Sequence, residues 1–185
     1  AQSPEHQRHS YCRDCMMVRS TAAQKSSVTF LSLDSYVTSH NQKHVDSIVS
    51  SVTFDNWRDI ELEGIPFGRY SSYLSMLTHK TQDVTETPTA WSDYLADLRN
   101  SLLTYTTVPA IADEVQPTHA VVLDRLYPTN RAFVASMHRR EVAVSGFTVS
   151  SFVPRRLRTV VFHPHPQSSQ TLIDSISARE SMKIA

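Results

Sequence analysis

The strongest constraint on the fold is an apolar stripe that follows a helix-start signal in the middle of the chain. Thr87 and Pro88 are residue types preferred at the cap and at the first position of an α-helix. The apolar side chains that follow recur at helical spacing, at Trp91, Tyr94, Leu95, Leu98 and Leu102. Such a stripe, about four turns long, has to be buried against other elements. The sequence therefore predicts a core helix here.

Two weaker stripes precede this segment and predict further helices. One begins near Ser39 and has the i, i+3, i+4, i+7 spacing of an amphipathic helix, at Val45, Ile48, Val49 and Val52. A similar spacing is found at Tyr70, Tyr73, Leu74 and Leu77. The N-terminal half is therefore predicted to be mainly helical.

After Pro117 the hydrophobic period changes to short runs rich in β-branched and aromatic residues. Strands are predicted at 119–124, 131–137, 141–152 and 156–162, with earlier ones at 27–37 and 59–63. Short connections between the later runs favour an antiparallel sheet of about four or five strands. We expect an α+β fold in which this sheet packs against helices from the N-terminal half and a C-terminal helix.

The two ends of the chain are expected to be polar arms or helices of the same domain, which spans residues 1–185. Residues 1–25 include a helix-start signature at Ser3, Pro4 and Glu5. Residues 167–185 carry apolar side chains at roughly helical spacing, at Leu172, Ile173, Ile176 and Met182.

Composition excludes several classes of function. The chain has only three glycines, Gly64, Gly68 and Gly146, which cannot supply the closely spaced glycines of a Rossmann or Walker-type site, so no nucleotide cofactor is expected. No apolar run approaches the length of about 18 residues needed to cross a bilayer, so no membrane partner is expected. With 18 basic and 18 acidic residues the formal net charge is zero, and any polyanion has to be met by a local patch.

The cysteines point to a reducing compartment and to a candidate zinc site. Two cysteines are too few for the disulfide framework of a secreted domain, so the chain is expected to be intracellular, with a virion as an alternative. Zinc is bound by thiolate and imidazole ligands, and Cys12 and Cys15 have the spacing of one ligand pair. The other two ligands are expected from elsewhere in the chain, such as His40 and His44, or His163 and His165. The alternative is that both cysteines are ordinary thiols and that the protein has no cofactor.

The clearest local charge imbalance lies in the C-terminal half. Between residues 131 and 158 there are six arginines and one acidic residue, Glu141. The arginine rim, defined as Arg139, Arg140, Arg155, Arg156 and Arg158, would lie at connections of the predicted sheet and could bind phosphates through forked hydrogen bonds. The alternatives are a solvated rim and salt bridges to acidic residues of a neighbouring subunit, such as those around Asp59, Glu61 and Glu63.

No catalytic constellation stands out in the sequence. Ser145 precedes Gly146 but lacks the second glycine of a nucleophile turn, and Asp93 and Asp97 have the spacing of neighbours on a solvated helix face. An enzymatic function is therefore not the favoured hypothesis. The first hypothesis is a structural subunit that self-associates or joins other proteins in a larger particle, such as a viral coat or a ribonucleoprotein, with RNA against the arginine rim. A zinc-stabilised binding module and a His-dependent hydrolase are the alternatives.

Overall fold

The computed structural model describes residues 28–123, 126–149 and 160–164, together with Met17, Ser20, Thr21, Gln24 and Lys25; side chains are described up to residue 146. The chain divides into two compact units, residues 1–35 and 36–185. In the first unit the backbone at 28–32 is irregular, and the short 3₁₀ helix η1 (Leu33–Tyr36) spans the boundary. The strand expected at 27–37 is therefore absent from residues 28–37. All elements below belong to the second unit.

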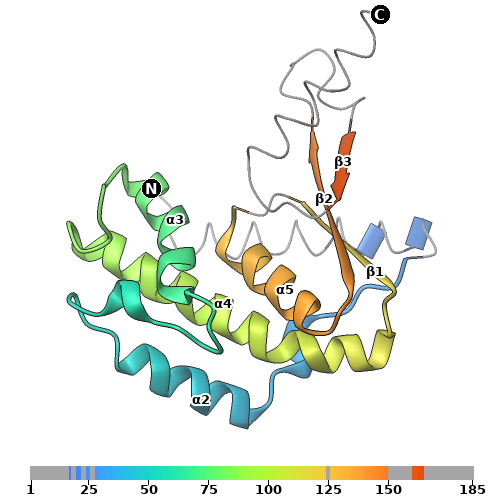
Figure 1. Ribbon diagram of the computed structural model, residues 1–185, viewed down its shortest axis with the longest axis horizontal. Helices are drawn as coiled ribbons and strands as arrows, with labels where there is room; N and C mark the ends of the chain where they lie inside the picture. Colours follow the sequence, from blue (N-terminus) through green and yellow to red (C-terminus); the bar gives the residue numbers. More distant parts are fainter. Residues whose placement is uncertain are drawn as a thin grey trace, which may run out of the picture. The chain divides into compact units, whose positions relative to one another are not determined.

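The predicted core helix is confirmed and is longer than its apolar stripe. Helix α4 (Pro88–Val115) has 28 residues, with Thr87 as the cap whose hydroxyl accepts a hydrogen bond from the Ala90 amide. Tyr94, Leu98 and Leu102 are fully buried. The helix continues through Pro109, and it is the element against which the other helices pack (Figure 1).

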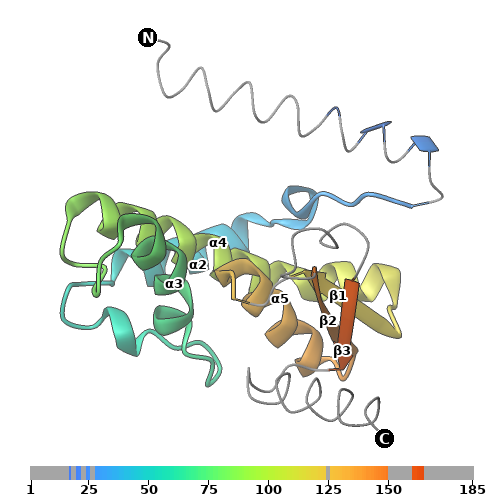
Figure 2. The same cartoon turned by 90° about the horizontal axis from the view of Figure 1, so that it is seen from above.

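Helices α2 (Ser39–Ser50) and α3 (Phe67–His79) are also confirmed, and both pack on α4. Thr38 caps α2 through a reciprocal pair of hydrogen bonds with Asn41, and Val45 is its fully buried residue. On α3 the buried face consists of small residues and one aromatic, whereas Leu77 of the apolar stripe is 59% exposed. In Figures 1 and 2, α2 and α3 lie beside α4, and the short 3₁₀ helix η2 (Trp57–Asp59) contacts α3.

A close backbone approach explains the small residues of α3. The Gly68 amide donates to the Ile60 carbonyl at 2.9 Å, and a Cβ at Gly68 would lie 1.9 Å from the Trp57 carbonyl oxygen. Ser75 donates to the Ala90 carbonyl of α4 at 2.6 Å. Larger side chains would separate these backbones, and the Ser75 hydroxyl also provides a buried hydrogen bond between α3 and α4.

The prediction of an antiparallel sheet of four or five strands is wrong, because the described chain is mostly helical and its sheet is small and partly parallel. Strands β1 (His119–Leu123) and β2 (Ala143–Val149) pair in parallel, and β3 (Val160–Pro164) adds to β2 in antiparallel orientation. The strand expected at 131–137 is helix α5 (Pro128–Arg139), which connects β1 to β2. The strand expected at 59–63 is replaced by η2 and a single bridge between Leu62 and Ile65.

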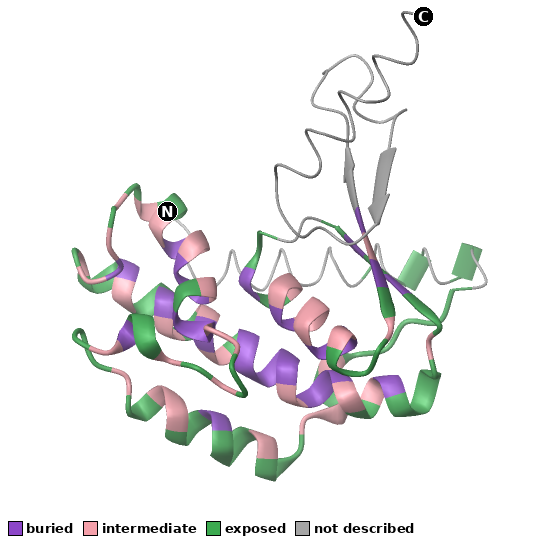
Figure 3. Ribbon diagram, viewed as in Figure 1, coloured by how far each residue is buried: buried purple, intermediate pink, exposed green. Residues whose placement is uncertain are grey.

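The physical reason for α5 lies in its small buried residues. Pro128 occupies the first turn, and Pro128, Ala132 and Ser136 recur every four residues on the face that is buried. Small side chains at this spacing let α5 lie close to α4, which favours a helix over the strand suggested by Phe133 and Val134. A helical crossover is also what allows β1 and β2 to run parallel. Figure 3 shows buried residues concentrated along α4 and on the faces of α3 and α5 that meet it.

Candidate functional site

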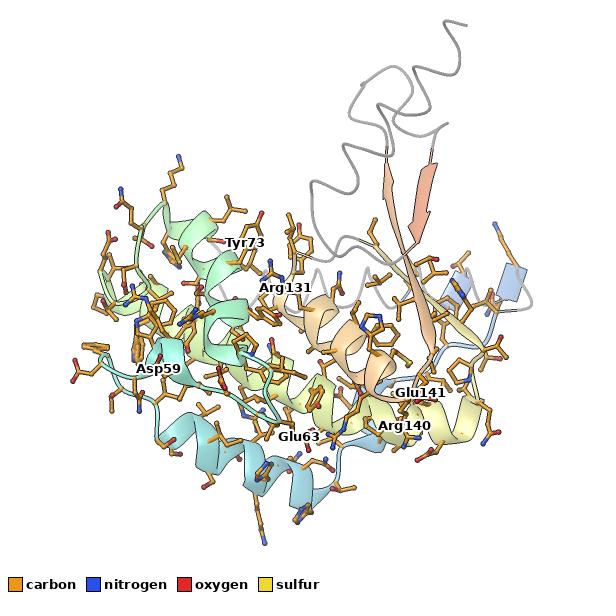
Figure 4. The ribbon with its side chains drawn as sticks, in the orientation of Figure 1. Asp59, Glu63, Tyr73, Arg131, Arg140 and Glu141 are labelled. Atoms are coloured by element: carbon orange, nitrogen blue, oxygen red, sulfur yellow. The ribbon has the colours of Figure 1, made fainter. Side chains whose placement is uncertain are left out.

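Two of the five rim arginines lie in the described chain, and both are paired within it. The Arg139 guanidinium contacts the Glu63 carboxylate and donates to the Tyr105 hydroxyl at 3.1 Å. Tyr105 in turn donates to Glu63 Oε2 at 2.6 Å. Burial raises the pKa of the Tyr105 hydroxyl, so the phenol stays protonated and serves as the donor. The three side chains join the end of α5 to α4 and to the loop before α3, in which Figure 4 labels Glu63.

Arg140 forms a forked ion pair with Asp113 of α4, in which Nη2 lies 2.8 Å from Oδ2. The acidic partners of Arg139 and Arg140 thus come from the same chain. Glu63, one of the acidic residues that the sequence offered as a partner for the rim of a neighbouring subunit, instead pairs with Arg139 of its own chain. Arg155, Arg156 and Arg158 lie outside the described residues, so the arginine rim as an RNA contact stays a prediction.

The sheet holds a serine–histidine contact that the sequence did not single out. His119 Nε2 of β1 lies 2.8 Å from Ser145 Oγ of β2, because a parallel register places them diagonally on one face. A histidine at this distance can act as a base toward a serine nucleophile. Among the described residues, however, no carboxylate bonds to His119 to orient it. The contact is therefore half of a hydrolase constellation and carries no proposed activity.

Two carboxylates, those of Asp93 and Asp97, lie one turn apart on α4; Asp93 is exposed and Asp97 is half-buried. Asp93 Oδ2 lies 2.8 Å from His79 Nε2, and Asp97 follows one turn later. Burial, with a smaller contribution from the charge of Asp93, raises the pKa of Asp97 to about 6. Asp93 and Asp97 are the carboxylate pair considered from the sequence. Among the described side chains only His79 bonds to either carboxylate, so neither is paired with a serine or threonine hydroxyl that it could activate.

The zinc candidates are not brought together by the described chain. His40 and His44 both lie exposed on α2, while Cys12, Cys15 and His165 fall outside the described residues and His163 is described by its backbone only. Within the described side chains, no group of three or more histidine, cysteine or acidic residues could hold a metal ion. The zinc site stays a prediction.

One edge of the sheet is open among the described strands. The order β1-β2-β3 leaves β1 with a partner on one side only. Its alternate residues Ala120 and Val122 are buried, whereas Val121 and Leu123 are 50% and 51% exposed. Natural edge strands are usually blunted by lysine, proline or a bulge, because an open row of amides and carbonyls pairs readily with another strand. The sequence His-Ala-Val-Val-Leu contains neither lysine nor proline.

Comparison with known proteins yields no relative: no protein-family model, no curated protein and no solved structure matches the chain. None of the described helices combines the length and the apolar character needed to span a membrane. Among the described features, the open edge of β1 supports a function most directly.

Proposed function

We propose that the protein is a structural subunit that self-associates through β1, as the first step in building a larger particle. The open edge of β1, which carries no lysine, arginine or acidic residue, is the observation that carries this proposal. A second copy supplies the missing strand by β-augmentation, in which main-chain hydrogen bonds provide the affinity. A viral coat or a ribonucleoprotein is the type of particle that fits such a subunit.

The burial pattern of β1 favours pairing with a second copy in one register. Exposed and buried residues alternate symmetrically about Val121. In an antiparallel pair centred on Val121, His119 lies opposite Leu123 of the second copy, and Val121 lies opposite its own equivalent. Exposed residues then meet exposed residues and buried ones meet buried ones, as a shared face requires. The contact has two-fold symmetry and yields a closed dimer. Other surfaces of this dimer would then make the contacts of the larger particle.

Cysteine cross-linking tests this register. In a Cys12→Ser/Cys15→Ser background, Val121→Cys should form a covalent dimer under mild oxidation, because directly opposed residues have Cα atoms about 4.5 to 5.5 Å apart, within disulfide range. Val115→Cys, at a similarly exposed site at the end of α4, is the matched control and should remain monomeric on a non-reducing gel. Equal cross-linking of both variants would contradict the proposed contact.

The native mass tests the same contact without cysteine chemistry. Val121→Lys places a charge at the centre of the edge and should shift the sedimentation mass from dimer or larger species to monomer. Val121→Thr keeps a β-branched side chain and should retain the wild-type mass. A wild-type chain that sediments as a monomer at micromolar concentration would show that the open edge is not an interface.

A further inference from the structure

One face of α3, the residues just after it and the start of α5 line an open groove of about 540 Å³. Its α3 side chains recur at helical spacing, so they share one face of the helix. The groove is lined by Arg69, Ser72, Tyr73, Met76, Leu77, Lys80, Thr81 and Arg131. Figure 4 shows Tyr73 and Arg131 at the gap between the two helices.

The charge of this groove is entirely positive. Arg69, Lys80 and Arg131 line it, and none of its lining residues is acidic. Arg69 and Lys80 are exposed and form no ion pair with any residue that the structure describes. Four other described arginines, Arg58, Arg99, Arg139 and Arg140, are neutralised by carboxylates, in contrast to Arg69. The groove is therefore a local cationic site in a chain of zero net charge.

One aromatic side chain, Tyr73, and two apolar ones, Met76 and Leu77, line the groove with these cations. The Arg131 guanidinium lies 4.8 Å from the centre of the Tyr70 ring, and Tyr73 is half-buried one turn along α3 from Arg69. Met76 and exposed Leu77 continue the apolar surface toward Lys80. The Thr81 hydroxyl beside them makes no hydrogen bond with the described part of the chain. Cations interleaved with ring faces are the combination that binds single-stranded nucleic acids.

We propose that the groove between α3 and α5 binds a single-stranded nucleic acid. Arg69, Lys80 and Arg131 contact successive phosphates, and a base stacks on the Tyr73 ring. Charge complementarity favours an anionic strand, and the aromatic surface favours one that carries bases over an acidic peptide, which gains nothing from a stacking platform. This site is distinct from the arginine rim and from the β1 edge, and it does not depend on self-association.

Fluorescence anisotropy with a labelled oligouridylate of about ten nucleotides tests the electrostatic part, with an oligothymidylate of equal length as a second probe. Three phosphate contacts predict that log K falls with log salt at a slope of about −2. Arg69→Ala/Lys80→Ala should reduce the slope by about 1.4 in magnitude and weaken binding of both probes. Lys43→Ala/Arg99→Ala removes the same total charge from α2 and α4, at positions that do not line the groove, and should leave the slope unchanged.

The stacking part is tested on Tyr73. Tyr73→Ala should weaken oligouridylate binding at least about fivefold, since a stacked base contributes about 1 kcal/mol or more, whereas Tyr73→Phe should bind like wild type. Circular dichroism of each variant confirms that α3 is retained. Equal affinity for the two probes supports recognition of phosphate and base plane alone, and a preference for oligouridylate supports RNA as the ligand.

Three results would overturn the proposal. One is a wild-type chain that binds neither probe at low salt. Another is loss of binding in Arg139→Ala/Arg140→Ala with full binding in Arg69→Ala/Lys80→Ala, which would place the strand at the rim instead. The third is binding of a polyglutamate peptide or an anionic vesicle that depends on Arg69 and Lys80 while Tyr73→Ala has no effect on any probe. Val121 does not line the groove, so a monomeric Val121→Lys variant should still bind both probes. Loss of self-association and loss of nucleic-acid binding can therefore be measured separately.

Discussion

Ser136 of α5 donates a hydrogen bond, 3.3 Å long, to the backbone carbonyl of Tyr105 in α4. In a regular helix this carbonyl would accept from the amide four residues later, but that position is Pro109, which has no N–H. The buried Ser136 hydroxyl thus satisfies the acceptor that the proline releases. This relationship explains how α4 continues through a proline and why α5 carries a serine at its contact with α4.

A double-mutant cycle tests this compensation. Ser136→Ala leaves a buried carbonyl without a donor and should lower the free energy of unfolding by about 1 to 3 kcal/mol. In a Pro109→Ala background the new amide can bond to the Tyr105 carbonyl, so the same serine substitution should cost clearly less. Urea unfolding of the four proteins gives the coupling. Strictly additive costs would mean that Ser136 and Pro109 are unrelated.

Gly68 is expected to tolerate no side chain. The Cβ of Gly68→Ala would lie 1.9 Å from the Trp57 carbonyl oxygen, and because that atom belongs to the backbone it cannot rotate away. We expect a loss of about 3 kcal/mol or more in the free energy of unfolding.

Gly64→Ala is the control for Gly68, since Gly64 has a φ of +79° but open space around its Cα. Only the left-handed backbone is penalised there, at about 1 to 2 kcal/mol. Chemical denaturation of the two variants measures the difference, and similar losses would show that the contact with Trp57 is not what excludes a side chain from Gly68.

Leu98→Ala tests the core helix that the sequence predicted. Leu98 is fully buried in the core formed by α4 and its neighbours, so truncation leaves a cavity and should cost about 2 to 5 kcal/mol. Leu77→Ala, on the exposed side of α3, should change stability by about half a kcal/mol or less. Thermal unfolding distinguishes the two, and a small effect at Leu98 would mean that the stripe is not the core.

The sequence predicted elements whose local signals agree with their tertiary role. Thr87 and Pro88 begin α4, and the spacing of Val45 and its neighbours defines α2, because apolar periodicity and capping act within a few residues. Helix α5 lacked such agreement. Phe133 and Val134 favour a strand, whereas the decisive contribution is the close fit of Ala132 and Ser136 against α4, which depends on residues far along the chain.

That error also concealed the candidate groove. With residues 131–137 placed in a strand, nothing would bring Arg131 to the same surface as Arg69 and Tyr73. The helical crossover does so, and it also makes β1 and β2 parallel. The apolar stripe of α3 was visible in the sequence, but periodicity alone does not say that it would be half-buried at Tyr73 and exposed at Leu77.

The last prediction concerns the pH dependence of stability at Asp97. Partial burial and the neighbouring charge of Asp93 raise its pKa to about 6, whereas in an unfolded chain an aspartate titrates near 3.9. The folded state therefore holds the proton more tightly. The resulting stabilisation is fully present below about pH 4 and is lost as the pH rises through about 6.

Asp97→Asn removes this titration and keeps the shape of the side chain. The variant should match the wild type near pH 4 and exceed it in free energy of unfolding near pH 7. We expect a gain of about 1 kcal/mol, less than the full shift implies, because water screens a partly exposed carboxylate. Urea denaturation from pH 4 to pH 7 follows the difference. A difference that stays constant with pH would mean that Asp97 titrates alike in the folded and unfolded chains, and that its burial and the charge of Asp93 have no net effect on stability.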